Sequence, residues 1–281
     1  MDPSCLEYRL TNAERERFET DGFLVVEEAL SGAQVRDLYN ASSEIVAAYR
    51  RERKLADDVM ANPFDFIGSG KPFLDLLDWH KTFPKVWGIL GWHIQLYHTH
   101  MMTVPPEPRA ADRKRLGWHQ DSGRLNLDFE TNPRPRVSVK IGYLLTDTRM
   151  PDSGSVYVVP GSHLRNELQF PEGDETEPVE AVPLRVPAGT AIIFDRRLWH
   201  ARGPNHSEAT RIALYYGYSY RWLKPRDDMT VDHLLEQSDP IRRQLLGDSV
   251  NGNHSFTSPQ EEDVPLRAWI SEHAGAEAVV P

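Results

Sequence analysis

Short apolar runs separated by turn residues dominate the chain from about residue 93 to residue 222. Six segments have the length and the β-branched and aromatic content of strands: HIQLYHTHMMTV, RVSVKIGYLL, SVYVVPGSH, VPLRV, TAIIF and RIALYYGYSY. Proline, glycine and polar residues lie between them, a pattern that is typical of antiparallel sandwiches and barrels. We therefore expect a mainly β core in this part of the chain.

The first third of the chain has a different pattern, which predicts helices. Residues 23–30 form a short apolar run and predict one strand. Ser31 is then a suitable N-cap for a helix, because the apolar positions after it recur at helical spacing. A second helical region is expected over residues 73–90, interrupted by Pro84, and a helical tail is expected from about Asp227.

Length and composition are those of an ordinary globular protein. Of the 281 residues, 40% are hydrophobic and 26% are charged, close to globular averages. We expect one domain over residues 1–281, with flanking helices packed on the β core of residues 93–222. The acidic segment at residues 171–183 is expected to be an exposed loop between strands.

Charge and signal patterns limit the partners. A formal net charge of -10 argues against general binding to nucleic acid or to an anionic membrane surface, although one group of basic residues stands out. The start lacks a secretory signal and no apolar run is long enough to span a bilayer, so a cytoplasmic location is expected. Cys5 lies in a terminus expected to be mobile and is not a catalytic candidate. The basic group comprises Arg109, Arg113, Lys114 and Arg115.

The first residues of chemical interest are His119 and Asp121, in the sequence GWHQDSGR. Residues two apart in a strand lie on the same face, so an imidazole nitrogen and a carboxylate oxygen can converge on one cation. This signal is weak by itself, because a histidine and an aspartate often occur at this spacing by chance.

A second motif strengthens the metal hypothesis. His200 follows the apolar strand TAIIF, and Arg211 begins another apolar strand eleven residues later. Two histidines and one carboxylate leave coordination positions open, as Fe(II) requires when it must bind a cosubstrate and dioxygen. A structural zinc site would need four closing ligands, typically thiolates that this chain cannot supply. Arg211 can bind a carboxylate through two hydrogen bonds from inside the barrel.

These motifs in this order resemble the phytanoyl-CoA dioxygenase family of 2-oxoglutarate oxygenases. The resemblance covers about residues 14–222 and includes WHQD, SGSVYVVPGSH and AGTAIIFDRRLWHARGPNHS. It implies a double-stranded β-helix, which is a jelly-roll, cupin-like barrel. It also implies that His119, Asp121 and His200 bind the metal and that Arg211 binds the distal carboxylate of 2-oxoglutarate.

The resemblance implies an Fe(II)-dependent dioxygenase that uses 2-oxoglutarate and O2. The expected reaction is hydroxylation of an unactivated C–H bond in a small molecule, such as one of secondary metabolism, with release of succinate and CO2. Asp121 argues against the halogenating relatives, which have Ala or Gly at that position. Leu116 departs from several relatives, which have Gln or Asn there to bind the cosubstrate. Lys140, the basic residue in an apolar strand, either binds a carboxylate of cosubstrate or substrate or points outward into water.

Two alternatives stay open. His98 and His100 form another pair two residues apart and would suit a cupin-type metal-dependent dioxygenase or isomerase that needs no 2-oxoglutarate. If they are not ligands, they are expected to line the pocket. The second alternative is a jelly-roll protein that binds a small molecule without catalysis.

Residues around the motifs carry further expectations. Trp118 and Trp199 are interpreted as barrel core, because alternation points each away from the neighbouring ligand. His206 is expected to be exposed, and His163 to be a structural residue of a turn. Three polar residues are the expected substrate contacts: Gln120, Arg124 and Asn126.

Overall fold

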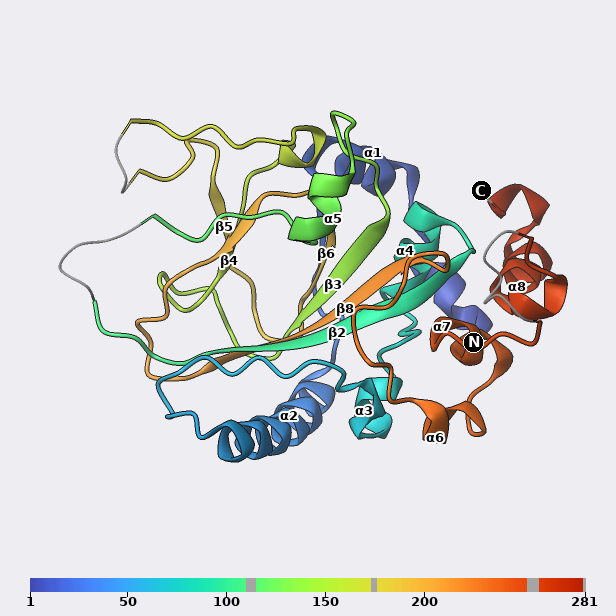
Figure 1. The fold of residues 1–281 in the computed structure, drawn as a ribbon, viewed down its shortest axis with the longest axis horizontal. Coiled ribbons are helices and arrows are strands. Elements are labelled where there is room, and N and C mark those ends of the chain that lie inside the picture. Colours follow the sequence, from blue (N-terminus) through green and yellow to red (C-terminus); the bar gives the residue numbers. More distant parts are fainter. Residues whose placement is uncertain (110–114, 173–175, 252–257, 280–281) are drawn as a thin grey trace.

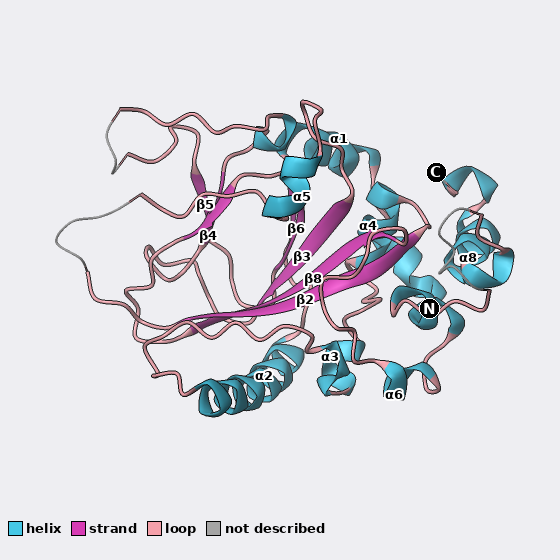
Figure 2. Cartoon of the chain, viewed as in Figure 1, coloured by secondary structure: helices cyan, strands magenta, loops and turns pink. Residues whose placement is uncertain are grey.

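The strands form two antiparallel sheets (Figures 1 and 2). The computed structural model describes residues 1–109, 115–172, 176–251 and 258–279. The strands are β1 (Phe23–Val26), β2 (Ile94–Val104), β3 (Ser138–Leu144), β4 (Val156–Val158), β5 (Val182–Leu184), β6 (Ala191–Asp195), β7 (His200–Arg202) and β8 (Arg211–Tyr220). The larger sheet has the order β1-β6-β3-β8-β2, and the smaller has the order β5-β4-β7.

Helices precede, interrupt and follow the strands. They are α1 (Asn12–Asp21), α2 (Gly32–Arg53), α3 (Lys71–Leu74), α4 (Phe83–Leu90), α5 (Gly123–Asp128), α6 (Asp232–Leu235), α7 (Pro240–Leu245) and α8 (Pro265–Ala274). In Figure 1, α2 and α3 lie below the long strands β2 and β8. Within the described residues, no helix combines the length and the hydropathy needed to cross a membrane.

Local sequence signals fix where the first helices begin and end. Ser31 caps α2: its Oγ accepts a hydrogen bond from the Gln34 backbone N–H, and the Gln34 side chain accepts one from the Ser31 N–H. The predicted N-cap is therefore confirmed. Gly22 ends α1 in the left-handed conformation, with φ 84°. A Cβ atom there would lie 2.5 Å from Nδ1 of His163, so both the backbone and the packing require glycine.

The outer face of the larger sheet packs against the helices. The larger hydrophobic cluster contains residues of α1–α4, α7 and α8 together with alternate residues of β3, β6 and β8. Three buried tyrosines on this face also anchor the helical layer by hydrogen bonds. Tyr216 and Tyr218 donate to backbone carbonyls of the α3 region, and Tyr143 lies 2.6 Å from the Thr82 hydroxyl. This leaves the inner face of the sheet for the site.

Some sequence expectations need correction. Cys5 is fully buried in a short 3-10 helix at Pro3–Tyr8, so the prediction of a mobile terminus is wrong. The strand predicted over residues 23–30 ends at Val26. Pro84 does not interrupt a long helix: it lies in the first turn of α4, where its missing N–H costs no hydrogen bond. The acidic segment is largely loop, although residues 173–175 lie outside the described residues, as do Arg113 and Lys114 of the basic group.

A buried carboxylate joins the loop after β8 to the middle of β2. Asp227 is 8% exposed and accepts hydrogen bonds from the backbone N–H and hydroxyl of Thr99 and from the backbone N–H of Asp65. Burial raises the pKa of Asp227 to about 6, against the effect of these hydrogen bonds, which lower it. These hydrogen bonds fix the loop, but they require that the Asp227 carboxyl group be removed from water.

The raised pKa predicts a pH-dependent stability difference between wild type and Asp227→Asn. The unfolded carboxyl group, with an ordinary value of 3.8, is ionised at both pH 5 and pH 7, whereas the folded group loses its proton between them. The unfolding free energy of the wild type therefore falls relative to that of the variant as pH rises from 5 to 7. Urea unfolding at both pH values measures this difference, with the exposed Asp58→Asn as control. An unchanged difference would contradict the pKa shift.

Candidate functional site

Three residues that can bind a metal converge between the two sheets. One ligand atom from each of His119, Asp121 and His200 lies within 4.8 Å of the other two. The backbone brings them together: His119 and His200 exchange two N–H···O hydrogen bonds of 3.0 Å, and the Asp121 N–H donates to the Arg196 carbonyl. His119 thus pairs in antiparallel register with the first residue of β7, and Asp121 pairs with the segment that precedes β7. This pairing brings the two motifs together.

Each histidine is oriented by a local hydrogen bond. Nδ1 of His119 lies 2.9 Å from the Gly117 carbonyl, and Nδ1 of His200 lies 2.8 Å from the Leu198 carbonyl. A carbonyl only accepts, so Nδ1 carries a proton in both rings and Nε2 is the nitrogen left for a metal. Burial lowers the pKa of His200 to about 4, so that ring is neutral near pH 7. His200 is therefore in the form that binds metals.

Lys140 points into the site rather than into water. Its side chain is 7% exposed, and its Nζ lies 2.6 Å from Oδ2 of Asp121. Burial alone would raise the pKa of Asp121, but Lys140 and the two histidines outweigh it and hold that pKa well below its usual range. Asp121 is thus a carboxylate, and the alternative of an outward lysine is wrong.

Arg211 reaches the same cavity from β8 and is 2% exposed. Its Nε donates to the Gly154 carbonyl at 2.9 Å. Among the described residues, neither Nη1 nor Nη2 has a hydrogen-bond partner. Burial lowers the pKa of this guanidinium, and the nearby Tyr215 opposes that effect. A buried charge of this kind is normally paired with an anion. The two terminal nitrogens of Arg211 are therefore available to an anionic group of a ligand.

Glycines make room for the rings on the inner face of the larger sheet. His98, Gly217 and Lys140 lie side by side across β2, β8 and β3. A Cβ atom on Gly217 would lie 2.4 Å from Nδ1 of His98, so this ring lies over the glycine. In the next row, the Tyr215 ring lies over Gly142 in the same way. The His98 and Tyr215 rings can lie against the sheet only because glycine occupies positions 217 and 142.

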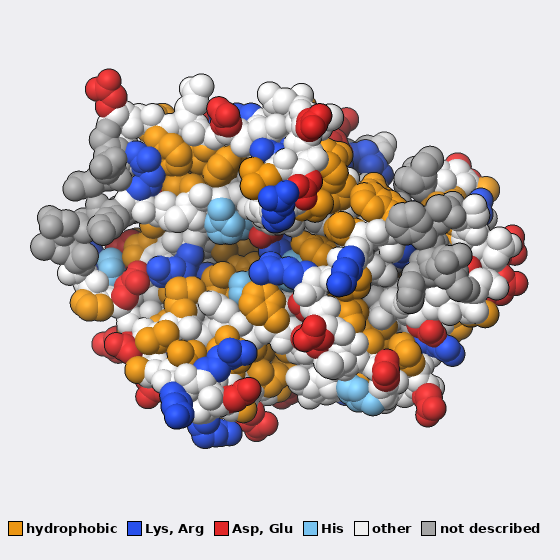
Figure 3. Space-filling model, in the orientation of Figure 1, with side chains coloured by type: hydrophobic (Ala, Val, Ile, Leu, Met, Phe, Trp, Pro, Cys, Tyr) orange, Lys and Arg blue, Asp and Glu red, His pale blue; other side chains and the backbone are white. Residues whose placement is uncertain are grey.

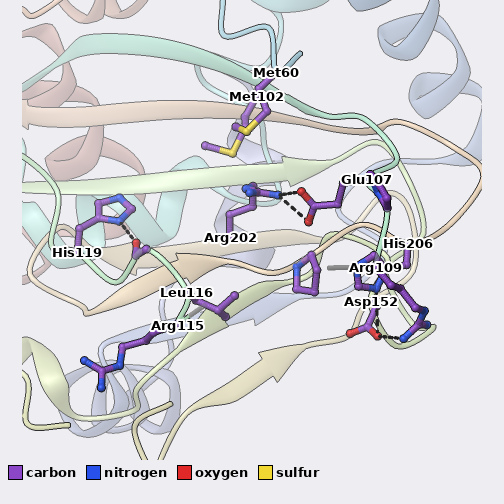
Figure 4. Close-up of a pocket in the computed structure, with 13 residues that line it drawn as sticks. Met60, Met102, Glu107, Arg109, Arg115, Leu116, His119, Asp152, Arg202 and His206 are labelled. Carbon is purple, nitrogen blue, oxygen red and sulfur yellow. Dashed lines mark hydrogen bonds and ion pairs between the residues drawn. The ribbon is translucent and has the colours of Figure 1, made fainter. Parts of the chain in front are cut away.

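The cavity has two connected parts. An inner chamber of about 400 Å³ contains the three convergent residues with Lys140 and Arg211. An outer chamber of about 690 Å³ shares Met102, His119 and Arg202 with it. Figure 4 shows Arg202 directed at Glu107 on the wall of the outer chamber, and Figure 3 shows a hollow with basic side chains around it. A ligand larger than the inner chamber can extend outward.

Comparison with known proteins decides the family. The chain matches the family model for phytanoyl-CoA dioxygenase over residues 18–213, more than half of its length. The chain belongs to the phytanoyl-CoA dioxygenase family. The predicted enzyme class, an Fe(II)- and 2-oxoglutarate-dependent dioxygenase, is thereby confirmed.

Several similar proteins share less than 30% sequence identity with this chain. An uncharacterized protein of Mycobacterium tuberculosis is 27% identical over 236 residues, covering 80% of this chain and 82% of the relative. The ectoine dioxygenase of Stutzerimonas stutzeri is 24% identical and covers 73% and 75%. HygX from Streptomyces hygroscopicus, solved with nickel and 2-oxoglutarate bound, has a TM-score of 0.59 at 16% identity, covering 77% and 90%. The carbocyclase SnoK from nogalamycin biosynthesis has a TM-score of 0.55 at 17% identity, covering 87% and 95%. These solved structures confirm the predicted jelly-roll core.

The three polar residues predicted to contact substrate have other roles in this dioxygenase. The Gln120 amide donates to the carbonyls of Arg165 and Arg197. Asn126 donates to the Asp121 carbonyl. Arg124 is exposed and pairs with Asp128 on the surface of α5. Gln120 and Asn126 therefore hold the segment of His119 and Asp121 in place. Gln120 also lines the inner chamber, so its contact with substrate stays a prediction, whereas Arg124 and Asn126 are not part of the described lining.

Other expectations have mixed outcomes. Trp118 and Trp199 are half-buried, with the Trp118 indole N–H donating to Glu177, so neither is a full core residue. His206 is half-buried and lines the outer chamber, so the prediction of an exposed side chain is wrong. His163 is buried beside Gly22 as a structural residue, as predicted.

The sequence interpretation missed two arginines that line the inner chamber, Arg202 and Arg226. Arg202 had a usable signal, because it lies two residues after His200 on β7 and so shares its face. Arg226 had none, since it lies in a loop whose position depends on distant residues.

The close packing at Gly217 predicts that Gly217→Ala is destabilising. The added methyl group meets the His98 ring, which must move toward the floor of the site. We expect a loss of about 1–3 kcal/mol in unfolding free energy, the usual cost of overpacking a core. Chemical denaturation measures this loss, with Gly123→Ala as control, where no atom lies within 4 Å of the added carbon. Equal stability of the two variants would contradict the packing described here.

Proposed function

We propose that this dioxygenase hydroxylates an unactivated C–H bond of a small molecule, such as a natural product, with release of succinate and CO2. One observation carries the proposal: three convergent metal-binding side chains share a cavity with a buried guanidinium whose two terminal nitrogens have no partner among the described residues. A dicarboxylate cosubstrate is suited to such a site, because one end can bind the metal and the other the guanidinium.

The proposed metal ligands are Nε2 of His119, Nε2 of His200 and a carboxylate oxygen of Asp121. The donor set of two imidazoles and one carboxylate is that of non-haem Fe(II) oxygenases with open coordination positions. The fit is supported by the Nδ1 hydrogen bonds, which leave both Nε2 atoms available, and by the ionised state of Asp121.

The other side chains bind and orient the cosubstrate. Arg211 is proposed to bind the distal carboxylate of 2-oxoglutarate through its two free nitrogens, while Gly154 fixes its Nε. Lys140 is proposed as a second contact for a ligand carboxylate. Its ammonium group lies on the cavity wall beside Asp121 and has three donors, only some of which Asp121 can use.

Bound iron supplies the redox chemistry that couples decarboxylation of 2-oxoglutarate to oxidation of the substrate by dioxygen. One oxygen atom of O2 enters the new hydroxyl group and the other enters succinate, so the atoms and electrons balance without another reductant. The protein contributes position: the inner chamber holds the cosubstrate between the metal ligands and Arg211, and the substrate C–H bond must approach from the remaining space.

The arrangement gives less support to the alternatives. Within the described part of the chain, the candidate metal cluster contains neither His98 nor His100. Burial holds the pKa of His98 well below its usual value and lowers that of His100 to about 3, so both rings are neutral parts of the cavity wall and its surroundings. A protein that only binds a small molecule does not need a metal-binding cluster with open coordination positions beside Arg211.

Anaerobic titration with Fe(II) and 2-oxoglutarate tests this proposal. The wild type should develop the weak visible metal-to-ligand charge-transfer band, and His200→Ala should not. Arg211→Met should need at least about 30-fold more 2-oxoglutarate, because a buried charge-assisted pair contributes about 2 kcal/mol or more. Arg243→Met, on the surface of α7, is the control and should behave as wild type.

The same titration separates the hypotheses. A wild type that binds iron but forms no band with 2-oxoglutarate would reject the cosubstrate assignment. If the band forms in Arg211→Met at the same 2-oxoglutarate concentration as in the wild type, only the proposed role of Arg211 would be rejected.

A further inference from the structure

The inner chamber has more positive charge than the proposed reaction requires. Its described lining includes four cationic side chains, Lys140, Arg202, Arg211 and Arg226, but the one carboxylate of Asp121, in a chain whose net charge is -10. Fe(II) and the dianionic cosubstrate cancel each other's formal charge, so the positive excess is still present when both are bound. Such a chamber attracts a further anion.

Three of the four cations have an assigned counter-charge. Lys140 pairs with Asp121, and Arg202 lies 3.4 Å from Glu107. Arg211 is assigned to the cosubstrate. No carboxylate of the described residues lies within ion-pair distance of Arg226, which is exposed at the edge of the chamber. Arg226 is therefore the cation to which the proposed reaction gives no role.

Arg226 is nevertheless held in a defined position. Its backbone N–H donates to the Tyr97 carbonyl at 2.6 Å, and the next residue is the buried Asp227. Its guanidinium lies over the Phe64 ring, 4.8 Å from the centroid. Phe64 stacks in turn on His100, with ring centroids 4.6 Å apart and planes 3° from parallel. A planar guanidinium fixed by stacking loses less entropy when it binds an anion.

Arg226 and Arg211 are attached to the chamber wall at distant points along β2. Arg226 is bonded at Tyr97, near the start of β2, whereas Arg211 pairs with Val104 at its end. Seven residues of extended strand separate these points, roughly 23 Å. Both side chains line the same chamber, so they reach it from opposite ends. Because Arg211 is assigned to the distal carboxylate of the cosubstrate, Arg226 is available to a second anionic group.

We propose that Arg226 determines substrate specificity by binding an anionic group of the substrate at the mouth of the inner chamber. The inference rests on the proposed function, and the group is a carboxylate, a phosphate monoester or a sulfate ester, which a guanidinium fork recognises alike. The exposed Phe64 ring, 41% accessible, offers an apolar contact beside the charge. The substrate is thus an organic anion, and a part of it that extends beyond the chamber can contact the exposed edge of the Phe64 ring.

Matched pairs of probes test the proposal on protein loaded with Mn(II) and 2-oxoglutarate. The pairs are 3-phenylpropanoate with 3-phenylpropanamide, and 2-phenylethyl phosphate and 2-phenylethyl sulfate each with 2-phenylethanol. Calorimetric titration should show that at least one anion binds the wild type about tenfold more tightly than its neutral partner, equivalent to about 1.4 kcal/mol. Which pair shows the preference identifies the anionic group.

Arg226→Gln should reduce the affinity for that anion to the level of the neutral partner, and Arg226→Lys should retain part of the preference. The control is Arg124→Gln, which removes another exposed arginine outside the chamber lining and should keep the wild-type preference. Affinity for 2-oxoglutarate, measured in the same samples, should be unchanged in Arg226→Gln. Because the side chain is exposed, thermal unfolding of this variant should match that of the wild type.

Three results would overturn the proposal. They are a wild type without preference for any of the anions, an Arg226→Gln variant that keeps the full preference, and an Arg226→Gln variant that loses affinity for 2-oxoglutarate. A wild type that binds the anion through Arg226 but does not bind 2-oxoglutarate with the metal would instead contradict the proposed function and leave the anion site standing.

Discussion

The site depends on one short piece of backbone pairing. Two hydrogen bonds between His119 and His200 join a segment before β3 to the start of β7, and they hold both imidazoles and the Asp121 carboxylate on one side. Buried side chains that are far apart in sequence then support this pairing. Gln120, which lies between the two candidate ligands, donates hydrogen bonds to the carbonyls of Arg165 and Arg197 and so anchors this segment. In this motif His119 and Asp121 are the candidate ligands, and Gln120 between them supports the backbone.

Charge compensation explains much of the rest of the cavity. A charge removed from water must find a partner, and each charged group in the inner chamber has either one in the protein or a position suited to a ligand. Asp121 is compensated by Lys140, whereas the buried Arg211 guanidinium has two nitrogens without a partner among the described residues, which we propose bind an anion from outside the chain. The same reasoning, extended to the chamber mouth, points to an anionic substrate.

The strands and the candidate metal-binding residues were predictable because their sequence signals are local. Alternation and β-branched runs located most strands, and the spacing of His119, Asp121 and His200 indicated the metal site. The roles of Gln120 and Asn126 were not predictable, because their amides bond to backbone groups that only the fold brings near. The position of the Arg226 guanidinium depends on stacking with Phe64, which lies 162 residues earlier in the chain. No spacing rule in the sequence connects these two residues.

A crystal structure grown without oxygen, with Mn(II) and 2-oxoglutarate, tests the central claim most directly. The account predicts Mn(II) bound by Nε2 of His119, Nε2 of His200 and a carboxylate oxygen of Asp121, with the distal carboxylate of 2-oxoglutarate on Arg211. Metal bound instead at His98 and His100, or a cosubstrate whose distal carboxylate lies away from Arg211, would contradict it.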